Sequence, residues 1–323
     1  MAAAAQDGMT AAHMTIEKLP VIDITNLARA GTRELIDAAC REWGFFQVTG
    51  HGVEEHLIST LRRQMHLFFG QSMEAKRAIL RTADNPWGFY DRELTRHTPD
   101  WKQVYDYGPP DGNAIKPQWP AALRDFPAAI QAFYDECDAL SLDLLRVIST
   151  NLGMSARSLD SYFRPTHTSF LRLNYYPRCP TAGRLGVNHH TDAGALTVLL
   201  QDEQPGLELL HRGAWTLIEP RPDALVVNIG DIVQVWSNDQ YRAASHRGLA
   251  SADMERFSAP FFFNPAYSTE YAPSIRPSPG PDRWPMFAYQ ITYHSAYAAI
   301  AGAAAMMVGG WRRRMPHATI MPA

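Results

Sequence analysis

Two histidines and an aspartate stand close together in the stretch GVNHHTDAGALTVLLQD, which runs from residue 186 to residue 202. His190 and Asp192 are two residues apart, and such residues on a β-strand point to the same face of a sheet. An imidazole nitrogen and a carboxylate oxygen would then converge on one point, as metal ligands do. His189 should point the other way and serve in packing or in a hydrogen bond. The pair alone is weak evidence, since His-X-Asp also occurs in ordinary surface turns.

His246 is the third ligand that such a site would need. It lies in NDQYRAASHRGL, just after the strand-like run IVQVW, and it can complete the site if that strand returns beside the first. Two histidines and one carboxylate on one face, with coordination positions left open, form the arrangement of non-haem Fe(II) oxygenases. Asn228 and Asp231 in NIGDI are expected to shape a turn between two strands.

A second polar group follows ten residues after His246. Arg256 and Ser258 in RFS share a strand face, and the guanidinium fork can bind both oxygens of a carboxylate. A surface salt bridge is the alternative, but FSAPFFFNP is typical of a core strand, where an arginine needs an anion. Asn174 and Tyr176 in LRLNYYP also share a face and can donate hydrogen bonds to the same anion, although ordinary strand packing would explain them too.

The elements that must position these residues change in character near residue 165. Before it, apolar residues at 3.6-residue spacing predict three helices, with short strands at LPVIDITNL and FFQVTGHGV. After it, short strand-like runs separated by Gly, Pro and Asp favour an antiparallel sandwich or barrel. We therefore predict a mainly β protein with flanking helices, whose core is a jelly roll and whose N-terminal region is mixed α/β.

Length and composition favour one soluble structural unit. The chain has 323 residues, a net charge of −3 and 46% apolar residues, so bulk charge does not indicate a nucleic-acid or membrane surface. Three distant cysteines argue against a disulfide framework and for a reducing, cytoplasmic compartment. We expect the following regions: 1–16 disordered, 17–115 helical and mixed, 116–160 a long helix, 161–275 the jelly-roll catalytic core, and 276–323 an alanine-rich helical region that packs on the body.

Five motifs occur in a characteristic order: NYYP, HTD, NIGDIVQVWSND, SHR and RFS. In this order and at these intervals they resemble the 2-oxoglutarate- and Fe(II)-dependent oxygenases of the isopenicillin N synthase-like group. LPVIDITNL and ACREWGFFQVTGHGV are similar to the N-terminal region of that group, so the resemblance covers most of the chain before residue 270. It implies a distorted double-stranded β-helix with flanking helices.

The resemblance also implies roles for the polar residues. His190, Asp192 and His246 would bind Fe(II), while Arg256 and Ser258 would hold the distal carboxylate of 2-oxoglutarate, assisted by Tyr176 and Asn174. The enzyme would use O2 to hydroxylate, desaturate or cyclise a small organic molecule, with release of succinate and CO2. Contacts to this substrate are expected from Tyr90, Arg92, Tyr105 and Phe263, although a surface loop anchored by its aromatic residues explains the region of residues 85–108 equally well.

Three other functions compete with this interpretation. An isopenicillin N synthase-like oxidase would use the Arg-X-Ser pair for its substrate and need no keto acid, but Asn174 and Tyr176 favour 2-oxoglutarate. A non-catalytic binding protein would not need all three ligands and the anion site, and a zinc hydrolase leaves Arg256 unexplained. We expect a monomer, with a dimer as the alternative, and a small-molecule partner without nucleic acid or membrane.

Overall fold

The computed structural model describes residues 18–110, 115–181, 183–266, 269 and 273–275. The segments predicted as a disordered N-terminus and as a C-terminal helix lie outside this range. Within it, no helix combines the length and the apolar character that a membrane span requires.

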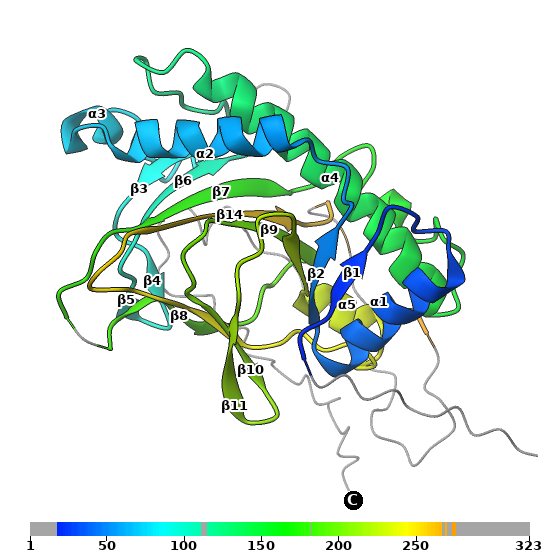
Figure 1. Ribbon diagram of the computed structural model, residues 1–323. Helices are drawn as coiled ribbons and strands as arrows, with labels where there is room; N and C mark the ends of the chain where they lie inside the picture. The colour runs from blue at the N-terminus through cyan, green and yellow to red at the C-terminus, as the bar shows by residue number, and fades with distance from the viewer. Residues whose placement is uncertain (1–17, 111–114, 182, 267–268, 270–272, 276–323) are drawn as a thin grey trace, which may run out of the picture.

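Two β-sheets form the core and face each other (Figure 1). In spatial order, the larger sheet contains β1 (Val21–Asp23), β2 (Phe45–Thr49), β12 (Leu225–Ile229), β9 (Leu196–Gln201), β14 (Arg256–Phe263), β7 (Phe170–Tyr176), β6 (Gln103–Tyr107) and β3 (Gly88–Tyr90). The smaller sheet contains β11 (Ala214–Ile218), β10 (Leu207–His211), β13 (His246–Leu249) and β8 (Leu185–His190). A separate hairpin joins β4 (Leu94–Thr95) and β5 (Thr98–Pro99). The predicted jelly-roll core with flanking helices is confirmed.

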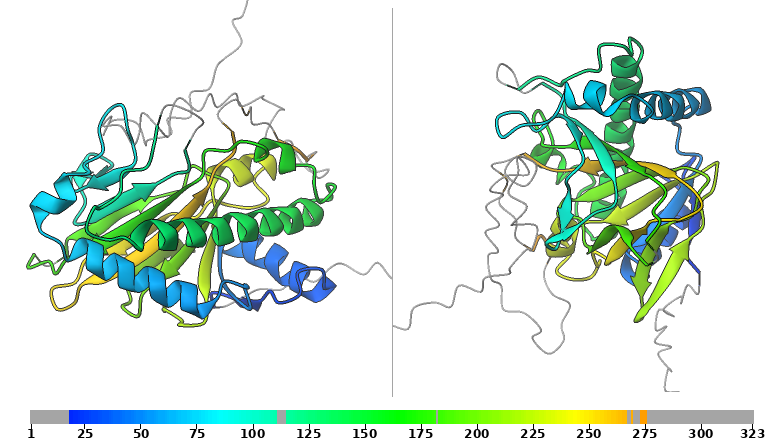
Figure 2. Two further views of the ribbon diagram at one scale, coloured as in Figure 1. Left: turned by 90° about the horizontal axis from the view of Figure 1, so that it is seen from above. Right: turned by 90° about the vertical axis from the view of Figure 1, so that its left-hand side faces the viewer.

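Helices cover the outer face of the larger sheet. They are α1 (Ala30–Glu42), α2 (Glu55–Phe69), α3 (Met73–Arg77) and α4 (Phe126–Asn151). Seen from above, α2 and α4 run side by side across the sheet (Figure 2). The apolar stripe of α4, including Ile130 and Phe133, belongs to the same buried cluster as Phe261 of β14. This packing leaves the other face of the sheet to line the space between the sheets.

Alternation along the strands decides which side chains enter that space. On β14, Phe257, Ala259, Phe261 and Phe263 belong to the helix-packed cluster, so Arg256 and Ser258 face the opposite way. In the antiparallel register, Arg256 lies opposite Tyr176 and Ser258 lies opposite Asn174. The polar residues of β7 and β14 therefore face inward together.

The run IVQVW is a helix rather than the predicted strand. It forms α5 (Asp231–Trp236), where Ile232, Val233, Val235 and Trp236 are all buried. A short apolar run fits a buried helix as well as a buried strand, so its pattern alone could not separate them. Gly230 begins the helix where a Cβ atom would lie 2.1 Å from the carbonyl oxygen of Gly194, so a side chain would clash there. His246 instead reaches the site on β13.

Candidate active site

His190, Asp192 and His246 come together at one end of the smaller sheet. His190 ends β8 and His246 begins β13, and the two are direct cross-strand neighbours. The Nε2 atom of each lies 3.6 Å from Oδ1 of Asp192, and the three potential ligand atoms lie within 4.8 Å of one another. Asp192 is not on the strand as predicted but in the loop that follows it. The loop, rather than strand alternation, brings its carboxylate to the histidines.

Backbone carbonyl groups orient both histidine rings. Nδ1 of His190 lies 2.8 Å from the carbonyl oxygen of Asn188, and Nδ1 of His246 lies 3.1 Å from that of Ala244. A proton on Nδ1 donates to these carbonyls and leaves the Nε2 lone pair directed at Asp192. This is the tautomer that a metal-binding histidine needs.

Two buried polar side chains hold the carboxylate of Asp192. Its Oδ2 accepts hydrogen bonds from Oγ1 of Thr197 at 2.6 Å and from Nδ2 of Asn228 at 2.8 Å, which leaves Oδ1 facing the histidines. The predicted turn role of Asn228 is therefore wrong, because Asn228 lies within β12. Thr197 was not predicted at all; its signal was a single polar residue within the apolar run LTVLL.

The charges of the group suit a divalent metal. Burial, together with the nearby His246, lowers the pKa of His190 and favours the neutral ring that coordinates metals. Burial would raise the pKa of Asp192, but both histidines and its two hydrogen bonds outweigh this and lower it. Two imidazoles and one carboxylate form the donor set of a facial Fe(II) site.

Arg256 is buried in the space between the sheets and forms no ion pair with an acid in the described part of the chain. It is 5% exposed, and no carboxylate of the described residues lies within 4.0 Å of its guanidinium. Its NH2 atom contacts Oε1 of Gln201 at 3.4 Å, its Nε atom has no hydrogen-bond partner, and its guanidinium lies 5.0 Å from the ring centre of Tyr176. A buried cation in this state is costly unless an anion binds to it.

Neighbouring residues complete a site that fits a carboxylate. Nδ2 of Asn174 donates to Oγ of Ser258 at 3.2 Å, and the buried Oδ1 of Asn174 has no partner. Glycines make room here: a Cβ atom at Gly206 would lie 2.9 Å from Cδ of Arg256, and one at Gly186 would lie 2.5 Å from Cδ1 of Tyr176. The four residues that the sequence suggested for 2-oxoglutarate thus converge on one inner face.

The predicted substrate contacts are only partly compatible with the structure. Tyr105 and Phe263 are fully buried in the outer cluster beneath the helices, a position that argues against the predicted pocket role of both. Their place in the strand alternation points them away from the inner space. Arg92 is largely exposed and pairs with Asp91 at 3.7 Å. Tyr90 lies opposite Val104 in the inward-facing register and remains a predicted contact.

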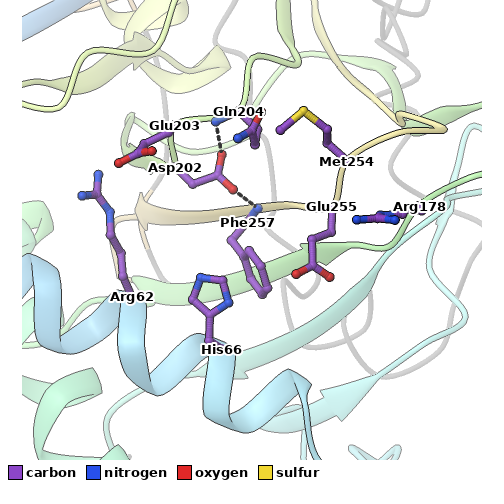
Figure 3. Close-up of a pocket in the computed structure, with 9 residues that line it drawn as sticks. All are labelled: Arg62, His66, Arg178, Asp202, Glu203, Gln204, Met254, Glu255 and Phe257. Carbon is purple, nitrogen blue, oxygen red and sulfur yellow. Dashed lines mark hydrogen bonds between the residues drawn. The ribbon is translucent and has the colours of Figure 1, made fainter.

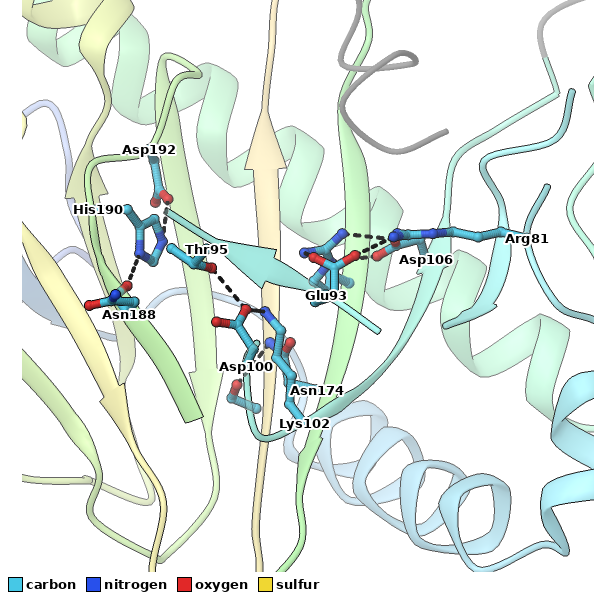
Figure 4. A network of polar contacts seen from close by, with 12 residues as sticks. Arg81, Glu93, Thr95, Asp100, Lys102, Asp106, Asn174, Asn188, His190 and Asp192 are labelled. Carbon is cyan, nitrogen blue, oxygen red and sulfur yellow. Dashed lines mark hydrogen bonds and ion pairs between the residues drawn. The ribbon is translucent and has the colours of Figure 1, made fainter. Parts of the chain in front are cut away.

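A buried network of charges that the sequence did not predict lies on the same inner side (Figure 4). Arg172 donates to both carboxylate oxygens of Asp106, at 2.7 and 2.9 Å, and to Glu93 at 3.1 Å. Arg81 donates to the same two acids. Two cations therefore neutralise two anions and connect the segment before β4 to β6 and β7.

A separate surface pocket lies between α2 and the loops that precede β10 and β14 (Figure 3). It is lined by Arg62, His66, Arg178, Asp202, Glu203, Gln204, Met254, Glu255 and Phe257. His190, Asp192 and His246 do not line this pocket. Its lining contains both acidic and basic side chains. Asp202 accepts backbone hydrogen bonds from Phe257 and Gln204 there, and so supports the start of β14.

Comparisons with known proteins match both halves of the chain. Residues 167–265 match the model of the 2OG-Fe(II) oxygenase superfamily, and residues 19–122 match the model of the non-haem dioxygenase in morphine synthesis N-terminal region. Jasmonate-induced oxygenase 1 of Arabidopsis thaliana is 34% identical over 264 residues, which cover 76% of this chain and 64% of that protein. Flavanone 3-dioxygenase 2 of Oryza sativa subsp. japonica is 34% identical over 269 residues, which cover 80% of this chain and 76% of that protein.

A solved structure shares the fold. The crystal structure of JOX2 in complex with 2OG, Fe and JA superposes with a TM-score of 0.73 at 32% sequence identity, over 79% of this chain and 77% of that one. The matched regions contain the polar groups described above. Because the similarity to the rice relative extends over three-quarters of its length and both family models match, this chain belongs to the 2OG-Fe(II) oxygenase superfamily.

Proposed function

We propose that the protein is an Fe(II)- and 2-oxoglutarate-dependent dioxygenase that oxidises a small organic molecule by hydroxylation, desaturation or cyclisation, with release of succinate and CO2. The observation that carries the proposal is the buried Arg256, which forms no ion pair with the described residues and lies in the same inner space as the His-Asp-His group. A keto acid that chelates a metal through one end and carries a carboxylate at the other end fits both features.

Each polar residue has a role in this proposal. His190 and His246 would hold Fe(II) through Nε2, and Asp192 would hold it through Oδ1. The bound iron would supply the oxidation of a substrate C–H bond with O2. Arg256 and Ser258 would bind the distal carboxylate of 2-oxoglutarate, with Tyr176 packed against the guanidinium and Asn174 beside the hydroxyl.

Succinate formation tests the proposal. Purified protein supplied with Fe(II), 2-oxoglutarate and O2 should form succinate, and a chelator should stop it. His190→Ala, Asp192→Ala and His246→Ala should each abolish the reaction, because each removes a ligand. His189→Ala is the matched control, since His189 contacts Asn188 and Trp215 and is not grouped with the other three residues. Undiminished succinate formation in any ligand variant would refute the assignment.

The substrate class needs a separate screen. The named relatives point to small organic molecules, so flavonoids, terpenoids, amino acids and peptides should be tested for stimulation of succinate release. We further propose a cytoplasmic monomer or dimer that acts without nucleic acid or membrane, in line with the near-neutral net charge of −3. Oxygen consumption without succinate would instead favour an oxidase that needs no keto acid.

A further inference from the structure

Lys102 is a buried cation that forms one ion pair, with Asp100, so most of its hydrogen-bond donors are unused among the described residues. Its side chain is 5% exposed, and Nζ lies 3.3 Å from Oδ2 of Asp100. That same Oδ2 also accepts a hydrogen bond from Oγ1 of Thr95 at 2.8 Å (Figure 4). An ammonium group can donate three hydrogen bonds. Among the described residues, Asp100 is the one acid within 4.0 Å of this ammonium.

Strand alternation turns Lys102 toward the inner space. Gln103, the next residue, faces the helices, where its Oε1 accepts a hydrogen bond from Lys76 at 2.9 Å. Val104 lies opposite Asn174 in the register of β6 and β7, on the inward face. Lys102 lies directly before β6 and two residues before Val104, so the same alternation, extended by one residue, places it on that face. Figure 4 shows it beside Asn174, on the side of the sheet toward His190.

Asn174 could serve the same carboxylate. Its Nδ2 donates to Oγ of Ser258, and its buried Oδ1 has no hydrogen-bond partner. Rotation of the amide would keep a hydrogen bond with Ser258 and free the N–H groups for an anion.

We propose that Lys102 is a second carboxylate-binding residue of this centre, distinct from Arg256, and that Asp100 holds it in position. The inference rests on the proposed function. Two carboxylates could bind there: the metal-side carboxylate of 2-oxoglutarate, or a carboxylate of the prime substrate. Both would accept charge-assisted hydrogen bonds from the ammonium of Lys102, which otherwise pairs with Asp100 alone among the described residues.

Calorimetric titration of 2-oxoglutarate into Mn(II)-loaded protein separates these sources without turnover. If the carboxylate belongs to 2-oxoglutarate, Lys102→Met should raise its Kd by about tenfold or more, and Lys102→Arg should restore part of the affinity. The Kd for Mn(II) alone should stay the same. Lys76→Met is the matched control, because Lys76 is a buried lysine of α3 that contacts the opposite face of β6 through Gln103.

An unchanged Kd for 2-oxoglutarate directs the test to the prime substrate. Monocarboxylic acids, each paired with its methyl ester, should then be compared as stimulators of succinate formation. The proposal expects stimulation by acids and not by esters, and loss of this preference in Lys102→Met. An unchanged Kd together with no preference for acids over esters would overturn it.

Asp100→Asn distinguishes binding from a purely structural ion pair. It removes the charge of Asp100 but keeps an oxygen that can accept from the ammonium, so a carboxylate-binding Lys102 predicts a clearly smaller loss of carboxylate affinity than Lys102→Met causes. Equal losses in both variants would make the pair structural and overturn the inference. Lys102→Gln replaces Lys102→Met if circular dichroism shows that the latter does not fold. Wild-type protein that binds neither Mn(II) nor 2-oxoglutarate would refute the proposed function itself.

Discussion

At the scale of single residues, Asp192 depends on the two side chains that hold its Oδ2 atom. The hydroxyl of Thr197 and the amide of Asn228 orient the carboxylate so that Oδ1 faces both histidines. Such outer contacts orient the ligand before the metal binds, and their loss typically weakens metal affinity by about 10- to 100-fold.

Thr197→Val tests this dependence with little change in side-chain volume. We expect the Kd for Mn(II), measured by calorimetry, to rise by about tenfold, because one of two hydrogen bonds to Asp192 is lost. Thr216→Val on β11 is the control, since Thr216 lies opposite Leu209 and makes no contact with the carboxylate. Equal affinity in wild type and Thr197→Val would show that Thr197 does not position the ligand.

Arg256→Met tests the distal carboxylate site. Loss of a buried charge-assisted contact should raise the Kd for 2-oxoglutarate by about 100-fold, while the Kd for Mn(II) stays the same. Arg247→Met serves as the control, because Arg247 pairs with Glu208 and stacks on Trp215 in the smaller sheet. A Kd for 2-oxoglutarate near that of wild type would show that its distal carboxylate binds at another site.

At the scale of elements, the segment that carries β4 and β5 is tied to the larger sheet by buried ion pairs. Glu93 contacts both Arg81 and Arg172, and these arginines also share Asp106. Burial would raise the pKa of Glu93, but Arg172 and Arg81 outweigh burial and hold the pKa well below 4.5. The segment is therefore held by an ionised Glu93.

Glu93→Gln should lower the unfolding free energy at pH 7 by about 3 kcal/mol, because two buried arginines lose one of their two acids. A carboxylate with a lowered folded-state pKa stabilises the fold above its unfolded pKa, and this stability is lost as pH falls toward the folded value. The difference in unfolding free energy between wild type and Glu93→Gln should thus be largest at pH 7 and decrease below about pH 4.5.

Urea unfolding of both proteins between pH 7 and pH 3 measures this difference. Asp223→Asn is the control, since it alters the exposed pair with Arg221 and should leave stability unchanged. A constant difference between wild type and Glu93→Gln across the whole pH range would contradict an ionised Glu93 as its source.

At the scale of the whole molecule, the proposed ligands connect distant parts of the chain. The metal group joins β8, its following loop and β13, and the carboxylate site joins β7 and β14. Ligands that bind the folded state alone stabilise it by about 2.7 kcal/mol at 100 times their Kd. Mn(II) with 2-oxoglutarate should therefore raise Tm by several degrees.

Differential scanning calorimetry can measure this shift, which excess chelator should reverse. His246→Ala should show a much smaller shift, because the metal would lose a protein ligand. The keto acid would then lose the metal that its chelating end binds. The same increase in Tm in wild type and in His246→Ala would mean that the ligands stabilise the protein at another site.

Much of the fold and the proposed site could be predicted from local patterns. The 3.6-residue periodicity of α4 and the strand runs after residue 165 depend on neighbouring residues in the chain, and the predicted jelly-roll core is confirmed. His190, Asp192 and His246 were recognisable because metal chemistry restricts ligand types. Arg256 was recognisable because a charge in an apolar strand requires a partner.

Other features depend on contacts between residues far apart in the sequence. Only the tertiary structure decided that IVQVW is helical, that Asp192 acts from a loop, and that Tyr105 and Phe263 face the helices. The same holds for Lys102 and for the bonds between Glu93 and Arg172. Side-chain type and spacing are local properties of the sequence. Which face of a strand is inward, and which charges meet across strands, follow from register and packing, which the whole chain determines.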